Sequence, residues 1–205
     1  KIKKEKNKIL TQGSIIDKLH KLLSSPNIVS KEFIATHYDH EVQATSIITP
    51  LQGEGRVFGN ATAIKPLFDD EKSIALSQAA YPQYAETNPY DMAGCSIDTA
   101  YKNLIVSGAN SKKIAILDNF CWCSSDEPER LYQLKEAAKA CYDYAVAYQT
   151  PFISGKDSMF NDFKGFDKTG KSVKISIPPT LLISSIGVVD KISHLTKITP
   201  DDGDI

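Results

Sequence analysis

The sequence predicts an α/β fold with a mixed β-sheet and helices on one face of that sheet. Two long segments carry apolar residues every three or four positions, which indicates amphipathic helices. Shorter segments rich in β-branched residues lie before, between and after them and are typical of strands. Strands that alternate with helices favour a sheet covered by those helices. The 205 residues suffice for one sizeable domain.

The first 29 residues are predicted to lead into that domain. Ser14 is a suitable N-cap for a helix over Ile15–Leu23, in which the apolar residues share one face. The sequence Ser-Ser-Pro-Asn at 24–27 ends this helix. A second, short helix is expected to start after Ser30 and to run towards His37.

Three strands are predicted next, because three short segments mix β-branched and alternating apolar residues. They cover Thr45–Thr49, Ala61–Leu67 and Ser73–Ala79. Glycines separate the first two segments, and acidic residues at 69–71 separate the second from the third.

The rest of the chain alternates helix and strand. Asn88-Pro89 provides an N-cap and a first helical residue for a helix that runs to about Val106 and ends at Gly108. The remaining predicted elements are a strand over Lys112–Leu117, a helix over about Glu127–Tyr148, a brief strand at Phe152-Ile153, a polar hairpin with turns at Gly165 and Gly170, and a buried strand over Leu181–Val189. We therefore place the α/β domain at residues 30–190 and interpret residues 191–205 as a linker or the start of a further domain.

The composition argues against several classes of protein. A net charge of −1 gives no field that would attract nucleic acid or an anionic membrane. The chain has no apolar run near the roughly 18 residues of a membrane helix, so we expect a cytoplasmic protein. Its four cysteines have neither zinc-site nor Cys-x-x-Cys spacing and are expected to be reduced and mostly buried.

The segment Ser154-Gly155-Lys156-Asp157-Ser158 is the strongest candidate site. Gly155 allows close approach of a ligand, Lys156 can neutralise phosphate, and Asp157 can hold Mg²⁺. We expect a loop that follows a short strand, which is where α/β folds usually bind ligands. The structural alternative is a tight turn with a Lys156–Asp157 ion pair.

Two further segments carry polar groups that suit a ligand. Asp118-Asn119 is expected to end a strand and to face a ligand there, unless these residues serve only as turn residues. Asn103 shares a helix face with Thr99 and can reach a metal or a phosphate, unless this face is simply solvated.

Two histidines, His37 and His40, stand beside Asp39 and Glu41. Their spacing would suit a metal if the segment were helical. The preferred interpretation is a polar helix end, where a histidine also suits the helix dipole.

Several of these segments together resemble one family. The segments are PFISGKDSMFND (151–162), ILDNFCW (116–122), YDHEVQ (38–43) and SIPPTLLIS (176–184). In order and spacing they are similar to the large subunit of phosphoribosylformylglycinamidine synthase, from about Ser30 to about Pro200. The match is to the second of that subunit's two α/β domains, since the Glu-His-Cys-Ser pattern of the first does not occur.

The resemblance implies a fold and a reaction. The fold is that of the N-terminal domain of the aminoimidazole ribonucleotide synthetase superfamily, in which two such domains share a barrel. The reaction uses ATP and Mg²⁺ to convert formylglycinamide ribonucleotide to the amidine, with ammonia from a glutaminase subunit or domain. The implied nucleotide-binding residues are Ser154, Gly155, Lys156, Asp157, Ser158, Asp118 and Asn119.

The metal set implied by the resemblance is only partly present. Asp157 and Asn103 match, whereas Asn60 replaces the aspartate of a Gly-Asp-Ala triplet and Thr99 replaces a glutamate. Three carboxylates thus become one, and Mg²⁺ prefers carboxylate oxygens. We therefore expect a weakened nucleotide site in a domain that serves mainly as scaffold.

The expected partners are the first α/β domain, the glutaminase and small-molecule substrates. The chain is expected to be a fragment of a longer subunit, and the isolated domain is expected to form a homodimer through its strands. One alternative is a free-standing ATP-using kinase or synthetase of the same superfamily, which Asn60 and Thr99 argue against. The other is a non-catalytic module that docks a glutaminase.

Overall fold

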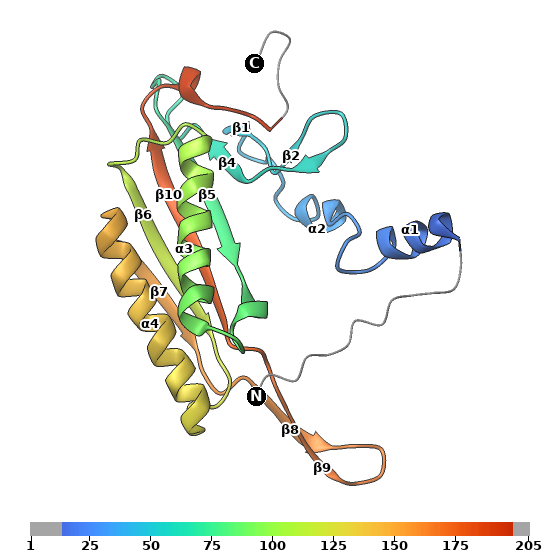
Figure 1. Ribbon diagram of the computed structural model, residues 1–205. Helices are drawn as coiled ribbons and strands as arrows, with labels where there is room; N and C mark the ends of the chain where they lie inside the picture. Colours follow the sequence, from blue (N-terminus) through green and yellow to red (C-terminus); the bar gives the residue numbers. More distant parts are fainter. Residues whose placement is uncertain (1–13, 199–205) are drawn as a thin grey trace. The chain divides into compact units, whose positions relative to one another are not determined.

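The computed structural model describes residues 14–198 (Figure 1). The described residues divide into two compact units, one up to His40 and one from Glu41 onwards. The first contains helices α1 (Ile15–Leu23) and α2 (Glu32–Ala35). Ser14 caps α1 as predicted: its side-chain oxygen accepts a hydrogen bond from the N–H of Asp17 (3.1 Å), and the Asp17 carboxylate accepts one from the N–H of Ser14 (3.2 Å).

The second predicted helix is shorter than expected. It ends at Ala35, and Asp39 and Glu41 have left-handed backbones with φ of 48° and 59°. His37 and His40 therefore lie outside a helix and do not have the spacing on one helix face that a metal site there requires. Across residues 14–198, no group of three or more His, Cys, Asp or Glu side chains could hold a metal ion.

The second unit is built on a mixed sheet of six strands. In spatial order the strands are β1 (Ser46–Ile48), β4 (Ala61–Ile64), β5 (Ser73–Ala80), β10 (Thr180–Val189), β6 (Ile114–Cys121) and β7 (Phe152–Ser158). All neighbours are antiparallel except β6 and β7, which are parallel. Two hairpins complete the strands: β2 (Leu51–Gln52) with β3 (Val57–Phe58), and β8 (Asp162–Phe166) with β9 (Ser172–Ser176).

Helices α3 (Pro89–Val106) and α4 (Pro128–Tyr148) cover one face of this sheet (Figure 1). We call this the helix face and the opposite one the open face. Alternate residues of β10 show the difference: the odd-numbered residues from Leu181 to Val189 are buried, whereas the even-numbered ones from Thr180 to Val188 are only half-buried. The predicted fold class is thereby confirmed. Short 3₁₀ helices cover Pro82–Tyr84 (η1) and Ile192–His194 (η2).

The strand predictions differ from the structure mainly at the ends. The strand predicted to reach Leu67 stops at Ile64, because Pro66 has no N–H to donate to a sheet. The β2–β3 hairpin was not predicted, since strands of two residues have too short a pattern to detect. Helix α3 begins as predicted: the side chain of Asn88 accepts a hydrogen bond from the N–H of Asp91 (3.1 Å).

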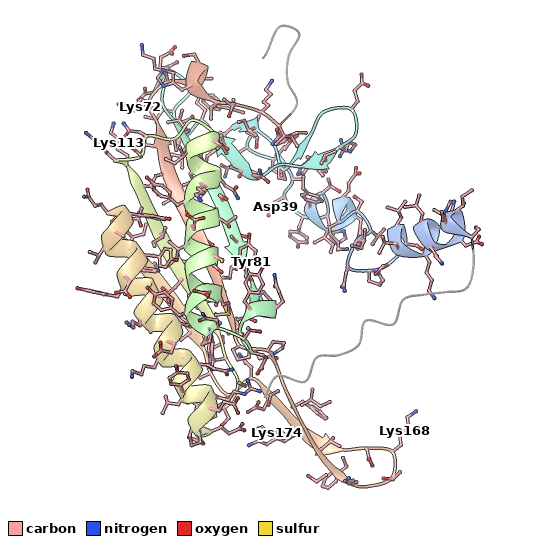
Figure 2. The ribbon with its side chains drawn as sticks, viewed as in Figure 1. Asp39, Lys72, Tyr81, Lys113, Lys168 and Lys174 are labelled. Carbon is pink, nitrogen blue, oxygen red and sulfur yellow. The ribbon has the colours of Figure 1, made fainter. Side chains whose placement is uncertain are left out.

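The β8–β9 hairpin projects from one end of the sheet. Figure 2 shows Lys168 at its turn and Lys174 on β9, while Lys113 lies at the opposite end of the sheet. All four cysteines are free thiols; Cys123 and Cys141 are buried, and Cys95 and Cys121 are half-buried. None of the helices in the described part of the chain combines the length and the hydropathy that a membrane span needs.

Helices α3 and α4 are joined by tyrosine–aspartate hydrogen bonds. Tyr148 donates to Asp98 (2.5 Å), which also pairs with Lys102 (2.8 Å), and Tyr90 donates to Asp143 (2.9 Å). The hydrogen bond to Asp98, together with burial and the Asp98 charge, raises the pKa of Tyr148 to about 12 from its ordinary value of 10.0.

This raised pKa predicts a loss of stability at high pH. Between about pH 10 and 12 the folded state keeps a proton on Tyr148 that the unfolded chain releases, so the free energy of unfolding should fall as pH rises. Tyr148→Phe should reduce this slope in urea unfolding measured across that range. Tyr142→Phe, at a position 71% exposed, should leave it unchanged; equal slopes in all three proteins would contradict the assignment.

Candidate functional site

The predicted site residues lie on two adjacent strands. Strand β7 pairs with β6 from Leu117 opposite Ser154 to Cys121 opposite Ser158. The prediction that residues 154–158 form a loop is wrong, because they belong to β7. The strand predicted to end at Leu117 is β6, which continues to Cys121. Strand β6 offers an unpaired edge, and β7 continues along it until the Trp122 N–H donates to the Ser158 carbonyl (2.7 Å). Polar side chains are tolerated there because β7 is an edge strand.

The strand conformation sends the predicted site residues to opposite faces, because successive side chains alternate along a strand. Gly155 and Asp157 lie on the helix face with Asp118. Lys156 lies on the open face, where its Nζ donates to the Ser158 hydroxyl and where Asn119 is its cross-strand neighbour. A Lys156–Asp157 ion pair, the structural alternative, is therefore not formed.

On the helix face, Asp118 occupies the space beside Gly155. A Cβ added to Gly155 would lie 2.4 Å from Asp118 Oδ1, so a larger residue here would displace the Asp118 side chain. Burial, and to a smaller extent the charge of Asp157, raise the pKa of Asp118. The buried thiol of Cys141 on α4 is a neighbour: burial first, and then the Asp118 charge, raise its pKa to about 12.

On the open face, the site is polar and carries one cation. Ser154, Lys156 and Ser158 on β7 share this face with Asn119 on β6. Ser154 and Lys156 are exposed, and Ser158 is half-buried. This side of β7 therefore offers two hydroxyls and one ammonium group to a ligand.

The two residues assigned to a metal lie on different elements. Asn103 is a half-buried residue of α3, and its main-chain carbonyl accepts a hydrogen bond from the Ser107 hydroxyl (2.7 Å). Helix α3 packs on β5 and β10, whereas Asp157 lies on β7, beyond β6. Thr99, one turn before Asn103, shares a hydrogen bond of 3.0 Å with the Tyr81 hydroxyl. The described contacts thus do not join Asn103 to Asp157.

A groove of about 410 Å³ borders Asn60 at the start of β4. It involves Gln78 on β5 and Ser184 on β10, which the sequence analysis did not single out. Gln78 Nε2 donates to Ser184 Oγ (3.2 Å). The available signal was the interruption of the apolar segment 181–189 by two serines, a polar break in an otherwise buried strand.

Curated relatives match nearly the whole chain. Phosphoribosylformylglycinamidine synthase subunit PurL from Ignicoccus hospitalis is 31% identical over 196 residues, which cover 96% of this chain and 25% of that protein. The PurL subunit from Thermococcus sibiricus is 32% identical over 202 residues, covering 98% of this chain and 25% of the relative. The chain thus spans about a quarter of the length of these relatives.

Solved structures show the same fold. PurLQS from Thermotoga maritima matches with a TM-score of 0.66 and 20% identity, over 84% of this chain and 26% of that one. PurL from Thermotoga maritima complexed with ADP matches with a TM-score of 0.62 and 19% identity, over 82% and 25%. A family model, AIR synthase related protein, N-terminal domain, matches residues 59–189. Because this match covers more than half of its residues, the chain belongs to the AIR synthase related protein family, through that family's N-terminal domain.

Proposed function

We propose that this chain is the second α/β domain of the large subunit of phosphoribosylformylglycinamidine synthase. That enzyme uses ATP to convert formylglycinamide ribonucleotide and glutamine-derived ammonia to formylglycinamidine ribonucleotide. In this proposal the domain supplies scaffold and part of a nucleotide site, and the isolated chain has no turnover. The observation that carries the proposal is the identity of 30–33% with PurL subunits over at least 91% of the chain.

The open face of β6 and β7 supports a role in holding phosphate. Lys156 supplies the positive charge, and the Ser154 and Ser158 hydroxyls supply hydrogen-bond donors on the same face. Asn119 adds an amide from the adjacent strand. These groups would bind and orient a nucleotide, with no bond made or broken by the chain itself.

The described residues fit Mg²⁺ poorly. Asn60 and Thr99 provide no carboxylate, and Asp157 lies on the face opposite Lys156. Asp118 and Asp157 form a carboxylate pair on the helix face, but the chain brings no third acidic group to them within the described residues. A magnesium-dependent step is therefore assigned to other parts of the enzyme, and here we propose a weakened, non-turnover site.

The open face also supports the proposed partners. Leu76 on β5 is 39% exposed there, and the half-buried Leu182, Ile186 and Val188 of β10 lie on the same face. Apolar side chains on the sheet face opposite α3 and α4 favour packing against another sheet. We propose the first α/β domain as that partner in the whole enzyme, with a glutaminase nearby, and a homodimer for the isolated chain.

The experiment that tests this function replaces the matching segment of the Thermococcus sibiricus PurL subunit by this chain. We expect the chimera to retain ammonia-dependent formation of the amidine, because the scaffold and the phosphate-binding groups are supplied by this segment. Lys156→Ala in the chimera should weaken nucleotide binding at this site about tenfold, the effect of one charge-assisted hydrogen bond. Lys112→Ala, at an exposed lysine in the turn before β6, is the matched control.

Three results would each contradict part of the proposal. A folded chimera without activity would remove the assignment to this enzyme. Low-micromolar binding of ADP with Mg²⁺ to the isolated chain, measured by calorimetric titration, would contradict the proposal of a weakened site. Light scattering that gives a monomer at high concentration would remove the homodimer alone.

A further inference from the structure

The groove at Asn60 lies on the open face, at the β4 side of the sheet. It is bounded by strands β4, β5 and β10 and by the segment from Pro50 to Asn60. Its volume of about 410 Å³ lies within the range of small-molecule sites. Three strands of the same sheet form its base, so its shape is set by the fold.

No ionisable side chain lines this groove. The lining residues are Pro50, Phe58, Gly59, Asn60, Ala61, Thr62, Leu76, Ser77, Gln78, Ser184 and Ser185. A groove without a cation has no charge to neutralise phosphate, and one without a carboxylate has no preferred ligand for Mg²⁺. Its chemistry therefore suits an uncharged group.

Amide and hydroxyl groups converge on the groove from three strands. Gln78 and Ser184 are direct cross-strand neighbours on the open face. The hydrogen bond from Gln78 to Ser184 uses one amide hydrogen, which leaves a donor and the carbonyl oxygen of the glutamine side chain to a ligand. Asn60 contributes a second amide, and Thr62 a hydroxyl.

Two hydrogen bonds hold the edge of the groove in place. The Ser77 hydroxyl donates to the main-chain carbonyl of Asn60 (2.9 Å), and the Gly59 N–H donates to the carbonyl of Pro50 (2.9 Å). A Cβ at Gly59 would lie 1.9 Å from the Gln52 amide nitrogen, so a larger residue here would displace the Gln52 side chain. The main chain on either side of the Asn60 side chain is thus held in place.

Two partly exposed apolar side chains complete the lining. Phe58 is 42% exposed and Leu76 is 39% exposed. An aromatic ring beside amide groups suits a flat, polar ring, since base–aromatic stacking contributes about 1–3 kcal/mol per base in nucleic-acid complexes. Ribose hydroxyls would match the amide and hydroxyl groups of the other strands.

We propose that this groove binds an uncharged nucleoside moiety and does so without a divalent cation. The class of ligand rests on the proposed function, whereas the neutrality and the independence of metal follow from the lining residues. The replacement of an aspartate by Asn60 would then convert a metal-dependent position into a neutral hydrogen-bonding one.

The test is calorimetric titration of the chain with adenosine, once with EDTA and once with Mg²⁺. We expect saturable binding with the same affinity in both, and AMP should bind no more tightly than adenosine. The double variant Asn60→Ala/Gln78→Ala should lose about tenfold in affinity, as two neutral hydrogen bonds predict. Both positions are exposed, so the variant should fold normally, and Gln83→Ala, at an exposed glutamine on η1, is the control.

Absence of saturable adenosine binding would overturn the proposal, as would binding that requires Mg²⁺ or that survives the double substitution. These results are separable from those of the chimera. An active chimera without adenosine binding would overturn the proposed ligand of the groove and leave the enzyme assignment in place. An inactive chimera with the expected adenosine binding would support the groove and overturn the enzyme assignment.

Discussion

Trp122→Ala is expected to lower the free energy of unfolding by about 3–5 kcal/mol, the usual cost of emptying the space of a buried aromatic side chain. Trp122 follows β6 and is fully buried. Its ring lies 5.8 Å from that of Phe120, and its Nε1–H donates to the carbonyl of Arg130 (3.0 Å). The side chain therefore joins the sheet to the first turns of α4. Urea unfolding followed by far-UV circular dichroism would measure the loss, since the chain has one tryptophan.

Trp122→Phe is the matched control, because it keeps an aromatic ring and removes the indole hydrogen bond. Its cost should be less than half that of the alanine variant. A loss below about 1 kcal/mol for Trp122→Ala, the cost of an ordinary substitution, would show that the residue does not anchor α4 to the sheet.

Gly108→Ala is expected to cost about 2–4 kcal/mol, from backbone strain and a clash with main-chain atoms. Gly108 has φ of +96° and follows α3 in a Schellman motif, in which its N–H donates to Ile105 and that of Ala109 donates to Leu104, both at 3.0 Å. An added Cβ would lie 2.0 Å from the carbonyl oxygen of His194. The segment 194–198 would have to move, although Thr196 bonds to the end of α3 and the Ile198 N–H donates to Gln52 (3.0 Å).

Gly170→Ala separates the two contributions. Gly170 also has a positive φ, +80°, but an added Cβ would meet nothing within 4 Å. Its cost should be that of strain alone, about 1 kcal/mol. Both variants keep Trp122, so its fluorescence can report unfolding. Equal losses in the two variants would mean that segment 194–198 shifts freely and does not stabilise the end of α3.

Local signals predicted the helices well. The Asn88-Pro89 cap and the glycine at 108 describe interactions at the two ends of α3, and the structure contains both. The apolar spacing predicted a helix up to Tyr148, and α4 ends there. The strands at the site were predicted less well. Asp118 and Asn119 have low strand propensity, but β10 and β7 pair with them on both sides. Such pairing depends on residues far away in the sequence.

The faces of the site could not be predicted for the same reason. A loop would have allowed Lys156 and Asp157 to converge on one ligand, whereas the strand separates them. The groove was also missed, because Gln78 and Ser184 are 106 residues apart and become neighbours only through the register of β5 and β10.

Strand β10 is the last strand of the described residues but lies in the middle of the sheet, between β5 and β6. During synthesis on the ribosome, β1, β4 and β5 therefore emerge without the strand that pairs them to β6 and β7. The complete sheet can form only after residues 180–189 have been made. A chain that stops before residue 180 would contain two separate sheet fragments, each with an exposed edge that can pair with other chains. Premature termination should thus yield aggregates in place of a smaller folded domain.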